Sequence, residues 1–267
     1  MSNPYVHGYD PRESVRLQDQ ASTLDELLHG DTVYPEGSRV LEAGCGVGAQ
    51  TVILAKRSPG AEFTSVDISP ASLAQAREAV DRAGFTNVTF HEGDIFDLRF
   101  EDASFDHVFV CFVLEHLADP EGALAALHRL IKPGGTLTVI EGDHGSTFMH
   151  PHSDDALKAV AALVELQARA GGNANIGRQL YPLLTQAGYR DCRVSPRMVY
   201  VDSSRPNYVE GFTRNTFTAM IAGVRSDVLA HGILDAATFD NGVQGLRRAA
   251  EDDGVFCYTF FKVLASV

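Results

Sequence analysis

The first half of the chain alternates short apolar runs with longer amphipathic segments. The runs are rich in β-branched and aromatic residues, which predicts buried strands, and the segments between them have helical periodicity. Five strands are expected at residues 40–44, 61–67, 87–94, 105–116 and 136–141, with helices at 48–57, 70–83 and 120–131. Such alternation is typical of a doubly wound α/β fold with a mostly parallel sheet.

The second half is less regular. Helices are expected at 154–170 and in a short segment ending at Ala187, and further strands at 189–202 and 255–265. Residues 203–253 are too many for a hairpin loop and have mainly helical patterns. We therefore expect a helical cap over the open edge of the sheet, and caps of this kind usually carry specificity. The expected units are an N-terminal arm (1–36), an α/β core (37–144, 176–202 and 254–267) and cap insertions (145–175 and 203–253).

Composition narrows the possible partners. The 267 residues carry a net charge of −13, which disfavours nucleic acid and anionic membranes because both need an electropositive face. No segment approaches the roughly 18 apolar residues that span a bilayer, so a cytoplasmic location is expected. The four cysteines are far apart in sequence, which indicates reduced, mostly buried thiols. A small-molecule partner remains, and the sequence leaves the oligomeric state open.

The run VLEAGCGVG, residues 40–48, predicts a strand that ends in a glycine turn. Gly44, Gly46 and Gly48 let the backbone turn sharply and approach a ligand. The turn nearly fits a dinucleotide fingerprint, since Ala49 completes a G-x-G-x-x-A spacing. However, Glu42 would repel a pyrophosphate and would attract a cationic ligand.

Two acidic residues follow the next two strands. Asp67 lies where a carboxylate can accept the hydroxyl protons of a ribose, although it could instead cap the helix that begins at Pro70. Asp94 could accept a hydrogen bond from an adenine amine while Ile68 and Ile95 enclose the base. The alternative for Asp94 is a loop aspartate bonded to local amides.

The segment CFVLEHL, residues 111–117, leaves the fourth strand beside the glycine turn. Its backbone, including that of Phe112, is a candidate to receive a charged amine. Glu115 and His116 fit a polar anchor for the loop better than a catalytic pair, and Cys111 has apolar neighbours typical of a core thiol.

Taken together, VLEAGCGVG, VDIS (66–69), GDI (93–95), FDHVFVCFVLEHL (105–117) and KPGGTL (132–137) resemble the class I S-adenosylmethionine-dependent methyltransferases, close to the ubiquinone/menaquinone-biosynthesis type. The resemblance covers about residues 39–141, with five motifs in the family's order. It implies a seven-stranded Rossmann-like sheet whose last strand is antiparallel, and S-adenosylmethionine as the methyl donor.

The resemblance also assigns roles to residues. It implies that Gly44, Gly46 and Gly48 lie along the methionine part of the cofactor, Asp67 at the ribose, Asp94 and Ile95 at the adenine, and Glu42 near the ammonium and sulfonium groups. In the expected arm over the cofactor, Tyr9 and Arg16 are candidate contacts, with Arg16 pairing with the carboxylate. Gln50 could reach the same carboxylate. The alternative for the arm is a surface helix.

Acceptor chemistry is expected after the fifth strand, where ligands of open α/β folds bind. His144 is the candidate catalytic base, because its ordinary pKa lies near neutrality. A metal site built from Asp143, His144, His150 and His152 is disfavoured, since these residues lack a regular ligand spacing.

Seven arginines and no lysine lie between Arg178 and Arg225. Arg178, Arg197 or Arg205 could hold an anionic acceptor, or the arginines could form surface ion pairs. The sequence thus predicts a methyltransferase acting on a small molecule, with the O, N or C atom undetermined. The alternatives are a non-catalytic S-adenosylmethionine-binding module and an NAD-dependent oxidoreductase.

Overall fold

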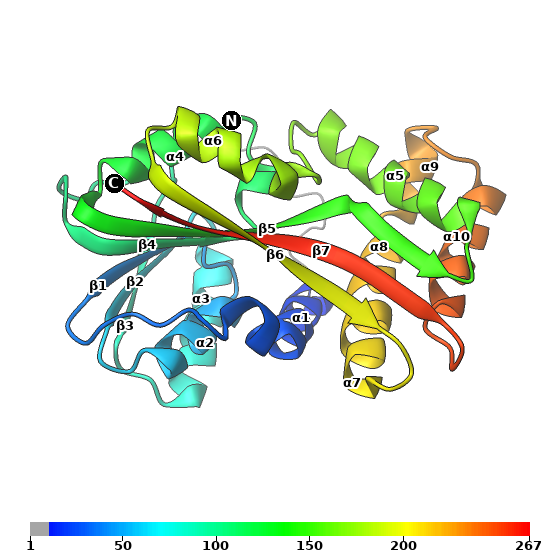
Figure 1. The fold of residues 1–267 in the computed structure, drawn as a ribbon, viewed down its shortest axis with the longest axis horizontal. Helices are drawn as coiled ribbons and strands as arrows, with labels where there is room; N and C mark the ends of the chain where they lie inside the picture. Colours follow the sequence, from blue (N-terminus) through cyan, green and yellow to red (C-terminus); the bar gives the residue numbers. More distant parts are fainter. Residues whose placement is uncertain (1–10) are drawn as a thin grey trace.

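The computed structural model describes residues 11–267 and contains one seven-stranded sheet. The strand order is β3-β2-β1-β4-β5-β7-β6, and β7 is antiparallel to both of its neighbours (Figure 1). The strand bounds are β1 Arg39–Ala43, β2 Glu62–Asp67, β3 Val88–Glu92, β4 Phe105–Cys111, β5 Ile131–His150, β6 Arg190–Val201 and β7 Val255–Ser266. The predicted seven-stranded, mostly parallel sheet with an antiparallel last strand is confirmed.

Helices cover both faces of the sheet. On one face lie α1 (Pro11–His29), α2 (Ala49–Arg57) and α3 (Pro70–Ala83), and on the other lie α4 (Pro120–His128) and α6 (Leu180–Gln186) (Figure 1). Successive side chains of a strand point to opposite faces of the sheet, and each face has its own hydrophobic core. Val40 and Phe109 pack in one core, and Leu41 and Val108 pack in the other. Burial on both faces explains why these strands are almost continuously apolar.

Local signals set several helix ends. Ser69 accepts a hydrogen bond from the Ser72 amide at the start of α3, Pro70 fills the first turn, and Gly84 ends the helix in the left-handed region. Asp119 caps α4 in the same way through the Gly122 amide. These caps fix where each helix begins beside the carboxyl ends of the strands.

The fifth strand is longer than the sequence pattern indicated. Expected to end at Glu141, β5 runs to His150 and pairs with β7 over most of its length. Residues 145–150, expected to belong to the cap, are therefore strand residues. The KPGG segment is an irregularity inside β5, where pairing with β4 shifts register between Phe105 and His107.

The fourth strand is shorter than expected. β4 ends at Cys111, and residues 114–116, predicted as strand, form the short 3₁₀ turn η1 (Leu114–His116). Glu141 explains the change, because one carboxylate oxygen accepts hydrogen bonds from the amides of Val113 and Leu114 at 3.0 and 2.7 Å. The Glu141 side chain, from the neighbouring strand β5, thus takes the place of backbone pairing for these two amides.

Most of the remaining helices gather around the parts of β5, β6 and β7 that run on past the other four strands (Figure 1). Their bounds are α5 Asp154–Arg169, η2 Ile176–Gln179, α7 Pro206–Tyr208, the π-helix η3 Val209–Thr218, α8 Ala219–Gly223, α9 Arg225–Ala230 and α10 Ala236–Arg248. The π-helix packs on α1, and α5 packs on α10. Within the described part of the chain, no helix is both long and apolar enough to cross a bilayer.

Candidate functional site

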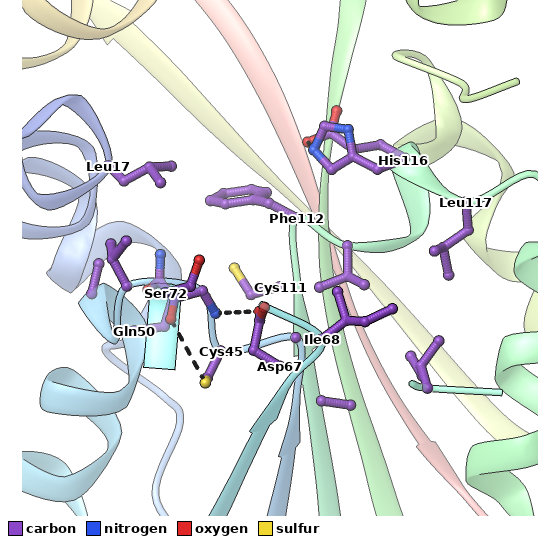
Figure 2. A pocket seen from close by; sticks show the side chains of 18 of the residues that line it. Leu17, Cys45, Gln50, Asp67, Ile68, Ser72, Cys111, Phe112, His116 and Leu117 are labelled. Carbon is purple, nitrogen blue, oxygen red and sulfur yellow. Dashed lines mark hydrogen bonds and ion pairs between the residues drawn. The ribbon is translucent and has the colours of Figure 1, made fainter. Parts of the chain in front are cut away.

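A cavity of about 600 Å³ lies at the carboxyl ends of the central strands. Its floor is the glycine turn and the segments that follow β2, β3 and β4, and α1 and η3 lie above it. Figure 2 shows Asp67 and Cys45 low in this cavity, with Phe112 and His116 extending above them from the segment after β4. The size suits a ligand of nucleoside dimensions together with a small second molecule.

The three glycines of the turn serve different purposes. All have positive φ, between 53° and 81°. A Cβ on Gly44 would lie 2.4 Å from Val113, and one on Gly48 would lie 2.8 Å from the Cα of Ala76, so both are needed for close packing. A Cβ on Gly46 would meet no atom within 4 Å. Gly46 therefore presents bare backbone to the cavity.

Asp67 is held against this turn. Its Oδ2 accepts the Gly46 amide at 2.8 Å, and its Oδ1 accepts the Ser69 amide at 2.9 Å. Burial raises the pKa of the carboxyl, while these amides oppose the rise. An ionised carboxylate has about four acceptor positions, so two remain for ligand hydroxyls.

The segment after β3 adds an apolar wall. Asp94 lines the cavity, and its Oδ1 accepts the Phe96 amide at 3.0 Å. Ile68 and Phe96 are 49% and 45% exposed, unusually high for large apolar side chains, and both line the cavity together with Ile95. Phe96 is an addition that the sequence patterns did not indicate.

Glu42 does not have the position that its sequence context suggested. It is absent from the cavity lining, and its Oε2 accepts hydrogen bonds from the hydroxyls of Thr51 and Ser65, both at 2.7 Å. Burial raises the pKa of the carboxyl to about 7. Glu42 thus links the first turn of α2 to β2 on the side of the glycine turn away from the cavity. This geometry does not support the expected contact between Glu42 and a cationic ligand.

The N-terminal arm supplies part of the lining. Arg16 is buried on α1, faces the cavity and donates to the Gln20 side chain at 3.0 Å. Gln50, on the first turn of α2, also lines the cavity. Tyr9 lies outside the described residues.

The segment after β4 is strained where it meets the cavity. Phe112 has φ of +57°, which is costly for an aromatic residue, and such strain clusters at functional sites. Its ring lies 5.4 Å from that of Phe260. The buried Glu115 and the half-buried His116 also line the cavity, with Nε2 of His116 3.6 Å from Oε1 of Glu115. Burial raises the pKa of Glu115. Burial likewise raises the pKa of the Cys111 thiol, as fits a core residue.

His144 projects from the extended β5 into the same cavity. Its Nδ1 lies 3.1 Å from the Ala174 carbonyl oxygen and 3.0 Å from the Tyr258 hydroxyl. A carbonyl can only accept, so Nδ1 is assigned the proton and Nε2 the lone pair. Nε2 is buried without a partner among the described residues, and burial lowers the pKa of the ring. At neutral pH the ring is thus a neutral imidazole whose acceptor nitrogen, Nε2, is buried beside the cavity without a hydrogen-bond donor among the described residues.

Part of the cavity lining comes from residues that the sequence analysis did not identify. The π-helix η3, α8 and β7 contribute six side chains to the lining, namely Phe212, Thr216, Phe217, Met220, Tyr258 and Phe260. The signal was the spacing FxxxTFxxM at 212–220, which places apolar groups on one face of a helix. Their chain position, more than 65 residues beyond His144, gave no indication that they meet it.

The arginines do not form an anion site. Arg178 makes a bidentate pair with Asp143, Arg197 pairs with Asp31, and Arg205 donates to the Tyr200 carbonyl. None of the three lines the cavity. Ion pairs, the alternative considered, are thus what the structure shows for Arg178 and Arg197, with the Asp143 carboxylate buried rather than at the surface.

The residues of the disfavoured metal site are dispersed. Asp143 is committed to Arg178, and His152 pairs with Asp154 at 2.9 Å. Across residues 11–267, no cluster of three or more His, Cys, Asp or Glu side chains has a geometry suited to a metal ion.

Comparisons of sequence assign the first part of the chain to a known family. Residues 35–188 match the family model described as a methyltransferase domain. An uncharacterized 37.1 kDa protein in transposon TN4556 of Streptomyces fradiae is 35% identical over 220 residues, covering 79% of this chain and 62% of that protein. The demethylmenaquinone methyltransferase of Thermus thermophilus is 40% identical over 103 residues, covering 39% of this chain and 46% of the enzyme. The chain thus spans less than two thirds of the length of these relatives.

Comparison of structures agrees on the fold. Haemonchus contortus phosphoethanolamine N-methyltransferase 2, solved with phosphomonomethylethanolamine and S-adenosylhomocysteine, superposes with a TM-score of 0.58 at 21% identity. The superposition covers 92% of this chain and 52% of that enzyme. At this identity the likeness extends to the fold alone.

Proposed function

The chain belongs to the methyltransferase-domain family, and from this premise we propose that it is an S-adenosylmethionine-dependent methyltransferase acting on a small, uncharged and largely apolar acceptor. The floor of the cavity would hold the donor. The part enclosed by η3, β7 and His144 would hold the acceptor.

The residues of the floor fit this donor. Asp67 would accept the ribose hydroxyls, and the segment 93–96 together with Ile68 would enclose the adenine. Gly46 offers space where any side chain would obstruct the ligand. Arg16 is the cation above the floor and is suited to the donor's carboxylate.

When bound, the donor supplies a methyl group activated by its attachment to a sulfonium. The task of the chain's residues is to hold an acceptor atom about 3 Å from that carbon, in line with the breaking bond, and to exclude water. Phe112, Phe212, Phe217 and Phe260 form an apolar surround suited to both tasks.

His144 lies beside this apolar surround and is suited to removing a proton. Nε2 of His144 would take the proton of an acceptor hydroxyl as the methyl group is transferred. Arg178 and Arg197 are paired with Asp143 and Asp31, and neither lines the cavity, which disfavours the anionic acceptor considered from sequence. We therefore favour oxygen as the methylated atom.

One observation carries the donor assignment more than any other. The Asp67 carboxylate and the Gly46 amide are joined at 2.8 Å beside a position that is open where a Cβ would lie, at the edge of a 600 Å³ cavity. This arrangement places a carboxylate that can accept hydrogen bonds from ligand hydroxyls next to backbone without a side chain.

The test is methyl transfer itself. The protein is incubated with S-adenosylmethionine and a panel of neutral hydroxyl compounds, primary amines and phosphorylated compounds, and S-adenosylhomocysteine and methylated product are measured by mass spectrometry. Turnover is expected with the neutral hydroxyl compounds, and His144→Ala should lower kcat by about 10²- to 10⁴-fold, the usual contribution of a positioned base. Unchanged turnover in that variant would remove His144 from the reaction. Donor binding without turnover on any compound would favour a binding module.

A further inference from the structure

The strand that carries His144 departs from regular pairing at this residue. β5 and β7 are in register up to Asp143 and Thr259, and pairing resumes only at Phe148 and Cys257. Ser146 bridges the gap, donating to the Asp143 carbonyl at 2.6 Å and accepting the Thr259 amide at 2.9 Å. Bulges of this kind redirect side chains beside active sites.

A separate segment holds the strand at this point. Residues 174–178, which we term the clamp, contact three consecutive residues of β5. Arg178 donates hydrogen bonds from Nε and Nη2 to the Asp143 carboxylate, at 2.9 and 2.6 Å. The Ala174 carbonyl accepts from both the amide and Nδ1 of His144.

The third contact and the packing complete the clamp. Asn175 Oδ1 accepts the Gly145 amide at 2.7 Å. Gly177 lies directly on the strand, since a Cβ there would be 2.7 Å from the Gly142 carbonyl oxygen. The clamp therefore fixes both the backbone of residue 144 and the tautomer of its ring.

We propose that Arg178 is a positioning residue that acts through His144, by anchoring the clamp to β5. The inference rests on the proposed role of His144 as the base. The Asp143 side chain is 4% exposed and its carboxylate is paired with Arg178, whose side chain is 49% exposed. The Arg178 guanidinium also lies against the strand, since a Cβ on Gly145 would be 2.6 Å from its Nη2. Loss of this pair would release the clamp beside the bulge, and the imidazole would lose its fixed direction and tautomer.

Small displacements matter at such a site. A misplacement of about 1 Å can cost on the order of 10²-fold in rate. We expect Arg178→Met, which keeps the apolar stem, to lower kcat by about 10- to 100-fold with little change in donor affinity. Arg178→Lys, which keeps the charge without the bidentate geometry, should recover part of that loss.

The chain offers a matched control. Arg225 makes the same bidentate pair with Asp240, at 2.6 and 2.7 Å, and neither residue lines the cavity. Arg225→Met should leave kcat unchanged. Asn175→Ala removes the clamp's hydrogen bond to the Gly145 amide, and it tests the inference independently should Arg178→Met not fold.

A double-mutant cycle separates positioning from general stability. If Arg178 acts through His144, Arg178→Met should slow wild-type protein but have no further effect in His144→Ala. Equal slowing in both backgrounds would overturn the inference. If His144→Ala alone has no effect, the proposed base fails, and the result is distinguishable from failure of the clamp.

A readout without turnover completes the test. Nitrogen NMR of donor-free protein reports the tautomer and pKa of His144. Arg178→Met should raise that pKa toward its ordinary 6.5 and mix the tautomers, because water reaches the ring, whereas Arg225→Met should change neither. An unchanged His144 resonance in Arg178→Met, with kcat also unchanged, would contradict the proposal.

Discussion

Glu42 and Asp67 lie at the ends of adjacent strands, and their surroundings give the two carboxylates different purposes. Asp67 borders the cavity and is bonded to backbone amides, whereas Glu42 is 2% exposed and bonded to two hydroxyls. Amides stabilise the ionised form more than neutral hydroxyls do. Asp67 is thus suited to ligand binding and Glu42 to bracing the turn.

The buried position of Glu42 predicts a pH-dependent stability. Its pKa is raised from 4.5 to about 7, so between these values the folded state holds a proton that the unfolded state releases. Stability is therefore lost as pH rises through this window. Glu42→Gln cannot titrate, and its stability relative to wild type should increase by about 3 kcal/mol from pH 4 to pH 8.

Urea unfolding at a series of pH values checks this prediction, with the exposed Glu62→Gln on the neighbouring strand as the control. A difference between Glu42→Gln and wild type that does not vary with pH would show that the pKa of Glu42 is the same in the folded and the unfolded protein.

At the residue scale, the sequence predicts the position of a residue well when that position depends on neighbours close in the chain. Gly44 and Gly46 follow the first strand, and Asp67 ends the second. The motifs therefore indicate where these residues lie in the fold and predict which part of the ligand each one contacts. The role of Arg178 depends on Asp143, 35 positions earlier, and Glu42 could not be placed because burial behind the turn is a tertiary property.

At the level of elements, strand and helix type were predictable, and some lengths were not. The helix at 70–83 was predicted at its observed bounds because Pro70 and Gly84 mark its ends. The extension of β5 through EGDHGSTFMH was missed, since its polar residues resemble a loop until β7, over a hundred residues later, pairs with it. Non-local pairing overrides local propensity here.

The π-helix contributes Phe212, Thr216 and Phe217 to the cavity lining. π-Helical segments are rare and are frequently found at functional sites. Here η3 crosses α1 closely at Gly211, where a Cβ would lie 2.1 Å from Thr23 Oγ1 and about 3 Å from two further atoms of that side chain. Rotation of Thr23 cannot relieve all three contacts, so glycine is required at this crossing.

Gly211→Ala should therefore separate η3 from α1. We expect a loss of about 1 to 3 kcal/mol in unfolding free energy, measured in urea, and faster amide exchange in α1. Gly223→Ala, at the end of the next helix, is the control, because a Cβ there meets no atom within 4 Å. Equal stability of the two variants would show that the crossing is not tightly packed.

For the whole molecule, the two halves of the cavity have different origins in sequence. The floor comes almost entirely from residues 43–119, one contiguous stretch within the matched family region. The rest comes from α1, β5, η3, α8 and β7, which meet because β5, β6 and β7 run on past the other four strands and helices gather around that part of the sheet (Figure 1). The donor was therefore predictable from motifs, whereas the region proposed for the acceptor required the fold.

Calorimetric titration with S-adenosylmethionine tests the central claim, that the floor of this cavity binds that donor. Wild-type protein should bind S-adenosylmethionine and not NAD. Asp67→Ala should weaken binding by about 1 to 3 kcal/mol, roughly 5- to 150-fold, the value of hydrogen bonds to a charged group. Asp81→Ala, exposed on α3 and outside the cavity, should bind as wild type does. An unchanged dissociation constant in Asp67→Ala, or binding of NAD in place of S-adenosylmethionine, would contradict the account.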